Sequence, residues 1–151
     1  MPDQNTDVAF ESTGGPFRLS AHAGHPVVLY FYPKDNTPGC TAEGAAFRDL
    51  HAAFRKAGAV VFGVSRDSLR SHASFKSKMA FPFELVSDAD EALCREFDVI
   101  RMKKMYGKSV RGIERSTFVI GAEGKVVKEW RGVKVPGHAE EVLAFVETLR
   151  A

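Results

Sequence analysis

Residues 27–43 read VVLYFYPKDNTPGCTAE, and this stretch is the most informative about the fold. Its first six residues, Val27–Tyr32, are aliphatic or aromatic, a composition typical of a strand that is buried on both faces of a sheet. Thr37 can serve as the N-cap of a helix, and Pro38 suits the first helical position. The stretch therefore predicts a buried strand, a short connection, and a helix that carries Cys40 at its third position.

The rest of the chain repeats this alternation of strands and helices. We expect Phe17–Ser20 to pair with the first strand, and one helix of about four turns to follow Cys40 and end at Gly58. Further strands are expected at 60–65, 84–87, 116–120 and 125–130, and further helices at 68–79, at 88–97 and along the apolar stripe from Ala139 to Leu149. Gly121–Gly124 would turn the last two strands into an antiparallel hairpin. This order predicts an α/β fold with a central mixed β-sheet flanked by helices, which is a thioredoxin-like plan.

The size and composition of the chain limit the class of protein. With 151 residues, 44% of them hydrophobic, the chain suits a single domain over residues 1–151. Its net charge of +2 gives no large field to attract nucleic acid or a membrane surface. Met1–Asp7 lacks the basic and apolar stretches of a secretion signal, and no apolar run approaches the roughly 20 residues that span a bilayer. Because two cysteines are too few for a disulfide framework, we expect a cytoplasmic protein.

The position of Cys40 suits nucleophilic attack. At the third position of a helix, unpaired backbone N–H groups and the positive end of the helix dipole favour an anion. Such a setting can lower the pKa of a thiol from its ordinary value of about 8.5, and the thiolate is the nucleophilic form. The alternative is a small residue packed in the first turn of the helix, because unpaired cysteines are commonly buried and inert. Placement favours the nucleophile over the inert residue.

Two motifs that lie far apart resemble the peroxiredoxin family. Pro33–Thr41 contains a proline, three residues, a threonine, two residues and a cysteine. This spacing resembles the peroxidatic signature of the family, most closely in its bacterioferritin-comigratory or peroxiredoxin Q branch. Glu114–Ile120, ERSTFVI, resembles the family segment that returns an arginine to the active site. Strand order and loop spacing agree from about Phe17 to the C-terminus, so the resemblance covers nearly the whole chain.

The resemblance implies that Cys40, Thr37, Arg115 and Pro33 form a catalytic site. Arg115 would lie beside the cysteine, where its forked guanidinium can stabilise the thiolate and donate to the peroxide oxygens. Thr37 would hydrogen-bond the peroxide, Pro33 would exclude water, and Glu43 would support the site by orienting Arg115. The plainer alternatives are an N-cap for Thr37, a strand end for Pro33, an ion pair with Glu43 or Glu114 for Arg115, and a favourable charge at a helix N-terminus for Glu43.

The implied activity is thiol-dependent reduction of hydrogen peroxide and organic hydroperoxides. Cys40 would be oxidised to a sulfenic acid and recycled by thioredoxin or a glutaredoxin-like thiol reductant. Two other functions compete with it. A thioredoxin-like binding or chaperone module without peroxidase turnover would share the fold, but it has no need of Thr37, Cys40 and Arg115 together. A disulfide oxidoreductase expects two cysteines separated by two residues, and this chain has Glu43 at the second position.

The other charged and polar clusters indicate no further partner. Residues 101–115 include six basic residues and Tyr106, but one basic loop is much less than the basic face of a nucleic-acid-binding protein. The five histidines lie far apart and show no metal-ligand spacing with Cys40 or Cys94. We therefore expect no metal, no cofactor, no nucleic acid and no membrane partner, and we expect a monomer or a weak dimer.

Cys94 departs from the commonest pattern of the branch that the chain resembles. Many members carry a resolving cysteine five residues after the first, where this chain has Ala45. Others carry it in the helix expected here at 68–79, which contains no cysteine. Cys94 is either a buried, inert residue or a resolving cysteine that must approach Cys40. The first alternative predicts a one-cysteine cycle, in which an external thiol reduces the sulfenic acid directly.

Overall fold

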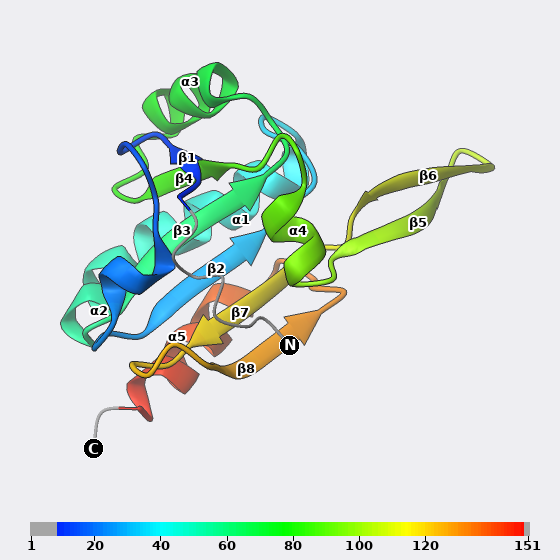
Figure 1. The fold of residues 1–151 in the computed structure, drawn as a ribbon. Helices are drawn as coiled ribbons and strands as arrows, with labels where there is room; N and C mark the ends of the chain where they lie inside the picture. The colour runs from blue at the N-terminus through cyan, green and yellow to red at the C-terminus, as the bar shows by residue number, and fades with distance from the viewer. Residues whose placement is uncertain (1–8, 150–151) are drawn as a thin grey trace.

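The computed structural model describes residues 9–149, so the expectation of no secretion signal at Met1–Asp7 falls outside it. A six-stranded sheet with the order β1-β4-β3-β2-β7-β8 forms its centre (Figure 1). The strands are β1 (Glu11–Ser12), β2 (Val27–Phe31), β3 (Val60–Ser65), β4 (Glu84–Ser87), β7 (Ser116–Ile120) and β8 (Val126–Arg131). β2, β3 and β4 are parallel, whereas β1, β7 and β8 pair antiparallel. The predicted mixed sheet is confirmed.

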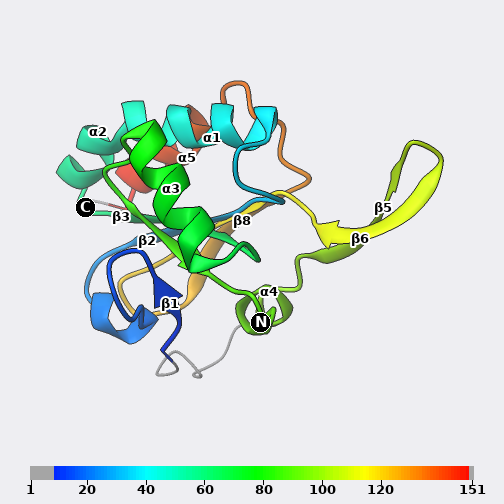
Figure 2. The same cartoon turned by 90° about the horizontal axis from the view of Figure 1, so that it is seen from above.

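Helices cover both faces of this sheet. They are the 3-10 helix η2 (Leu19–His22) and the α-helices α1 (Pro38–Asp49), α2 (His51–Lys56), α3 (Leu69–Met79), α4 (Ala92–Glu96) and α5 (His138–Glu147). In the view along the sheet, α1, α2, α3 and α5 lie on one side and α4 lies on the other (Figure 2). Within residues 9–149, no helix is long and apolar enough to cross a membrane.

The sheet separates two hydrophobic cores. All five residues of β2 are buried, as predicted, and its side chains alternate between the two faces because successive residues of a strand point in opposite directions. One core receives Val28 and Tyr30, and the other receives Val27, Leu29 and Phe31. Cys40 belongs to the first core and Cys94 to the second. The two cysteines are therefore buried on opposite faces of the sheet.

The expected pairing of Phe17–Ser20 with the first strand is wrong. Both sides of β2 are occupied, by β3 on one side and by β7 on the other. Phe17 instead forms an isolated antiparallel bridge with Phe10, and the chain then turns into η2 at Leu19.

The helix expected from Cys40 to Gly58 is two helices. α1 ends at Asp49, and the backbone amide of Leu50 bonds the carbonyls of both Ala46 and Arg48. Leu50 has a φ of −100° and a ψ of 3°, which departs from α-helical geometry and interrupts the helix, and α2 begins directly afterwards. The predicted end is correct, because Gly58 follows α2 with a φ of +85°, a conformation that glycine adopts readily.

The segment expected to be a basic loop is a β-hairpin. β5 (Ile100–Met105) and β6 (Lys108–Ile113) form a two-stranded sheet that projects from the body of the molecule (Figures 1 and 2). Tyr106 and Gly107, with φ of +54° and +80°, make the tight two-residue turn that suits the twist of a hairpin. A tyrosine at such a turn position is uncommon, so the sequence lacks the usual turn signal of a hairpin here.

Candidate active site

The first turn of α1 presents Cys40 at the position expected from the sequence. Thr37 is the N-cap residue with an extended backbone, Pro38 is the first helical residue, and Cys40 is the third. The Thr37 hydroxyl does not cap the helix through its side chain, because it donates to the carbonyl of Lys34 at 2.8 Å. The Cys40 side chain is 1% exposed, so the sulfur lies beneath the surface of the first turn.

Strand register explains how Arg115 reaches this turn from far along the chain. Phe31, the last residue of β2, pairs with Ser116, the first residue of β7. Arg115 therefore emerges beside the connection that follows β2. Its Nη2 atom lies 3.0 Å from the point where a side chain on Gly39 would begin, so the guanidinium packs directly over the glycine that precedes Cys40.

Electrostatic interactions link Arg115 to the cysteine and to Glu43. Burial acts to lower the pKa of Arg115, but the neighbouring Glu43 and Cys40 raise it above its ordinary value. Arg115 Nη1 donates to Glu43 Oε1 at 2.6 Å. Of the alternatives considered for these two residues, the structure therefore has Glu43 paired with Arg115.

Glu43 is itself an unusual carboxyl group. It is 1% exposed, and burial raises its pKa from 4.5 to about 7 although Arg115 opposes the shift. Its second oxygen, Oε2, has no hydrogen-bond partner in the described part of the chain. A buried carboxyl with one bonded oxygen thus fixes the guanidinium that packs over the first turn of α1.

Pro33 lies in the same connection, directly after β2, and is half-buried. The structure thus gathers four of the predicted residues, Thr37, Cys40, Glu43 and Arg115, at the end of β2 and the start of α1, with Pro33 at the entry to that connection.

Cys94 is not brought to this site. It lies on α4, across the sheet from α1, and its side chain is fully buried. Its backbone N–H donates to Asp88 Oδ2 at 2.7 Å. Burial, followed by the charge of Asp88, raises the pKa of the Cys94 thiol well above its ordinary range. Both cysteines are free thiols.

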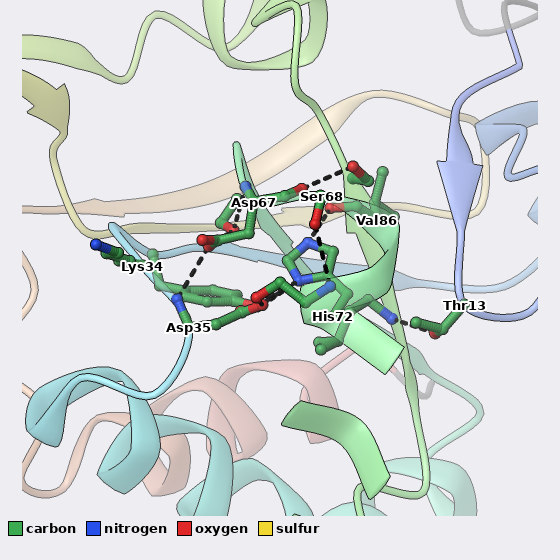
Figure 3. A network of polar contacts seen from close by, with 12 residues as sticks. Thr13, Lys34, Asp35, Asp67, Ser68, His72 and Val86 are labelled. Carbon is green, nitrogen blue, oxygen red and sulfur yellow. Dashed lines mark hydrogen bonds and ion pairs between the residues drawn. The ribbon is translucent and has the colours of Figure 1, made fainter. Parts of the chain in front are cut away.

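A polar cluster beside the connection escaped the sequence analysis (Figure 3). It joins Tyr32 and Asp35, on the two sides of Pro33, to Asp67 and to His72 of α3. Its signals in the sequence are weak: Asp35 lies inside the motif from Pro33 to Thr41 without an assigned role, and His72 is one of five histidines that show no metal-ligand spacing. His72 is fully buried, where an unpaired polar side chain is costly.

The cluster also has the composition of a metal site. Ligand atoms of Asp35, Asp67 and His72 lie within 4.8 Å of one another. These atoms already face hydrogen-bond donors, however. The Tyr32 hydroxyl donates to Asp35, the Asp35 backbone N–H donates to Asp67, and the two carboxylate oxygens of Asp35 face His72 Nδ1. The arrangement fits a hydrogen-bond network better than a ligand set, which needs lone pairs free for the ion.

Comparison with known proteins assigns this geometry to a family. The family model described as AhpC/TSA matches residues 1–129. Peroxiredoxin Bcp of Xanthomonas campestris pv. campestris is 59% identical over 148 residues, 97% of this chain and 92% of the relative, and peroxiredoxin Bcp of Bacillus subtilis is 51% identical over 136 residues, 90% and 87% of the two chains. A solved structure of the bacterioferritin comigratory protein of Xanthomonas campestris, studied for its alkyl peroxide reduction activity, superposes with a TM-score of 0.90 at 58% identity and covers 95% of this chain and 92% of its own.

Proposed function

Because the chain belongs to the AhpC/TSA family and, within it, to the peroxiredoxins of the Bcp and Q type, we propose that it reduces hydroperoxides with Cys40 as the attacking thiolate. The enzyme is a thiol peroxidase with a thioredoxin-like fold. The observation that carries the assignment of residues is the Glu43-bound guanidinium of Arg115 over Gly39, which holds a fixed positive charge beside Cys40.

In the oxidising half of the cycle, the Cys40 thiolate attacks the terminal oxygen of the peroxide. The O–O bond breaks, the sulfur is oxidised by two electrons to a sulfenic acid, and the departing oxygen takes a proton to leave as water or an alcohol. Negative charge grows on the departing oxygen as the bond breaks. Arg115 and the Cys40 backbone N–H are the donors that would face this charge, and Pro33 would shield the site from water. The Thr37 hydroxyl, which donates to the Lys34 carbonyl, would bind the peroxide by accepting a hydrogen bond from it.

In the reducing half, a protein dithiol restores Cys40. One of its thiols attacks the sulfenic sulfur and releases water, and its second thiol breaks the mixed disulfide to release Cys40 as a thiol. Thioredoxin or a glutaredoxin-like protein is the proposed reductant. Cys94, on the far side of the sheet with a protonated thiol, is proposed to take no part, which makes the cycle a one-cysteine cycle.

The proposed setting follows from the same features. A cycle that starts from free thiols at both cysteines suits the reducing cytoplasm. Thr37, Cys40, Glu43 and Arg115 meet within one chain, so the proposed site needs no residue from a second copy, and we propose a monomer or a weak dimer folded as one domain. Neither nucleic acid nor a membrane is needed as a partner. Arg101 and Arg111 of the basic hairpin are engaged in ion pairs with Asp98 and Glu91.

Two measurements test this proposal. Peroxide consumption should require a dithiol system of thioredoxin, thioredoxin reductase and NADPH. After one equivalent of peroxide and no reductant, mass spectrometry should find one added oxygen on Cys40 and an unmodified Cys94. Oxygen on neither cysteine, together with no peroxide consumption, would show that the family activity is absent from this chain.

A further inference from the structure

Asp35, in the connection between β2 and α1, binds several neighbouring elements at once. Its backbone N–H donates to Asp67 Oδ2 at 2.9 Å, and its carboxylate accepts the Tyr32 hydroxyl at 2.7 Å and the Ser71 hydroxyl at 2.7 Å. His72 Nδ1 lies 2.8 Å from the same carboxylate. One residue of the connection is thus bonded to the end of β2, to the segment after β3 and to α3 (Figure 3).

His72 links Asp35, which we call the anchor of the connection, to the central sheet. Its Nε2 lies 2.9 Å from the carbonyl oxygen of Val86 in β4, which can only accept a hydrogen bond. Its Nδ1 faces both oxygens of Asp35, at 2.8 and 3.1 Å. A ring that makes both bonds donates from both nitrogens and carries a positive charge. Asp35 and His72 therefore form a charged pair, with the imidazole fully buried and the carboxylate almost so.

A buried charged pair tolerates little displacement. Burial acts to raise the pKa of Asp35, but hydrogen bonds from His72 and Tyr32 hold it below its ordinary value. Moving the carboxylate away would leave the imidazolium without its counter-charge in the core, which is costly. Asp35 is therefore held in one position by α3 and, through His72, by β4, together with Tyr32 and Asp67.

That position is transmitted to the residues of the peroxidase site. Asp35 lies between Pro33 and Thr37, and the Thr37 hydroxyl is oriented by the carbonyl of Lys34, the residue directly before Asp35. The connection also contains Asn36 with a φ of +64°, a left-handed conformation that asparagine adopts more readily than most residues and that makes the chain turn before Thr37. The anchor thus sets where the connection holds Thr37 and where α1 begins.

We propose that Asp35 and His72 are positioning residues of the peroxidase site, which hold Thr37 and the first turn of α1 in the geometry that peroxide attack requires. The inference rests on the proposed function of Cys40. It assigns no contact with peroxide to either residue: both act through the connection from residue 33 to residue 37.

The first test pairs two buried carboxylates that hold different elements. Asp35→Asn removes the charge that anchors the connection, and Asp88→Asn removes the carboxylate that accepts the backbone N–H groups of Leu93 and Cys94 in α4. In rapid-mixing measurements with hydrogen peroxide, Asp35→Asn should oxidise Cys40 about ten to a hundred times more slowly, the loss expected from a small misplacement of a reacting geometry. Asp88→Asn should keep the wild-type rate.

Amide hydrogen exchange gives a readout that does not need activity. In Asp35→Asn, exchange should accelerate over residues 33–41 and stay unchanged over α4. In Asp88→Asn, it should accelerate over α4 and stay unchanged over residues 33–41. Unchanged exchange and an unchanged oxidation rate in Asp35→Asn would overturn the proposal, as would an equal loss of rate in Asp88→Asn. A wild-type protein that fails to reduce peroxide would refute the proposed function, while the exchange pattern would still decide whether Asp35 anchors the connection.

Two substitutions of His72 separate its two bonds. An asparagine amide can replace Nδ1 and donate to Asp35, whereas a glutamine amide can replace Nε2 and donate to Val86. His72→Asn should therefore retain a faster oxidation of Cys40 than His72→Gln, even if the two variants unfold at the same urea concentration. The reverse order would mean that His72 only joins α3 to β4. If neither variant folds, Ser71→Ala removes one hydroxyl from Asp35 and should slow oxidation about two- to fivefold; a wild-type rate there would overturn the proposal.

Discussion

Cys40 and Cys94 occupy nearly the same local position on opposite faces of the sheet. Each is the third residue of a helix, each is buried, and each lies near a carboxyl group whose pKa burial has raised, Glu43 in one case and Asp88 in the other. Helix position and burial alone would therefore predict the same chemistry for both thiols.

The difference lies in the charges that face each sulfur. Near Cys40, the carboxylate of Glu43 is bound to Arg115, which adds a permanent cation over the first turn of the helix. Near Cys94, the Asp88 carboxylate accepts hydrogen bonds from the backbone N–H groups at the start of α4. The positive end of this helix is therefore already bound to one anion. A nearby cation favours a thiolate, and a nearby anion opposes it. A helix N-terminus therefore favours a thiolate only where the charges of the neighbouring side chains also favour it.

The largest expected effect is that of Cys40→Ser. A serine hydroxyl is almost wholly un-ionised at neutral pH, so peroxide reduction should be abolished while the urea unfolding curve stays close to that of the wild type. Peroxide consumption with excess dithiol is the measurement. Peroxide turnover in this variant would contradict the proposal that Cys40, and not Cys94, attacks the peroxide.

Arg115→Lys should have the next largest effect. A point ammonium cannot reproduce the planar fork that bonds Glu43 and faces Cys40, and the second-order rate with peroxide should fall about tenfold to a thousandfold. Arg111→Lys is the matched control, because Arg111 also binds a buried glutamate, Glu91, but belongs to the projecting hairpin. Equal losses in the two variants would show that the effect is not specific to the site.

Gly39→Ala tests the close approach of the guanidinium. The added methyl group would lie 3.0 Å from Arg115 Nη2, so the side chain of Arg115 must shift by a few tenths of an ångström. We expect peroxide oxidation about three to ten times slower, a fraction of the loss for a displacement of about 1 Å. Gly112→Ala, where the nearest atom is 3.8 Å away, should keep the wild-type rate.

Glu43→Gln should change how stability depends on pH. The folded-state pKa of Glu43, about 7, is above its ordinary 4.5, so the folded protein binds this proton more tightly than the unfolded chain. The free energy of unfolding should therefore fall as pH rises through this range. Between about pH 5 and about pH 8, the wild type should lose about 2 to 3 kcal/mol more than Glu43→Gln in urea titrations.

The exposed Glu140→Gln is the control for that measurement and should leave the pH profile of the wild type unchanged. A parallel pH dependence in the wild type and Glu43→Gln would mean that Glu43 is ionised throughout this range in the folded protein.

The smallest effect on turnover is expected from Cys94→Ser. Peroxide turnover with a dithiol should stay near that of the wild type, although the buried hydroxyl should lower stability by about 1 to 2 kcal/mol. Mass spectrometry of peroxide-treated wild type should find little disulfide between Cys40 and Cys94. A stoichiometric disulfide and a collapse of turnover would make Cys94 the resolving residue and require α4 to leave its core.

The sequence could predict the features that depend on local signals. The residues that commonly start a helix place Thr37, Pro38 and Cys40 correctly. The alternation of apolar segments predicts the main strands of the central sheet and its mixture of parallel and antiparallel pairs. The pairing of Phe17 failed because a short apolar segment does not specify its partner, and the sites beside β2 are taken by strands from far along the chain.

The partners within the site could be predicted only in part. The sequence indicates Glu43 and Arg115 as possible partners, because the family resemblance places Arg115 near Cys40 and Glu43 follows Cys40 by one helical turn. No sequence pattern, however, sets a 2.6 Å bond between residues on different elements. Asp35 and His72 were missed for the same reason. Their pairing depends on α3 lying against β4, which is a property of the assembled sheet.

The register of β2 with β7 also governs when the enzyme becomes competent during its synthesis. A ribosome releases the N-terminal part of the chain first, so β2 and Cys40 emerge long before Arg115 and Ser116 exist. Pairing between segments so distant in sequence is slow, and an unpaired apolar strand is prone to aggregation. The nascent chain therefore contains the Cys40 thiol before Arg115 can lie beside it. Antioxidant capacity can appear only after β7 has been translated and inserted beside β2.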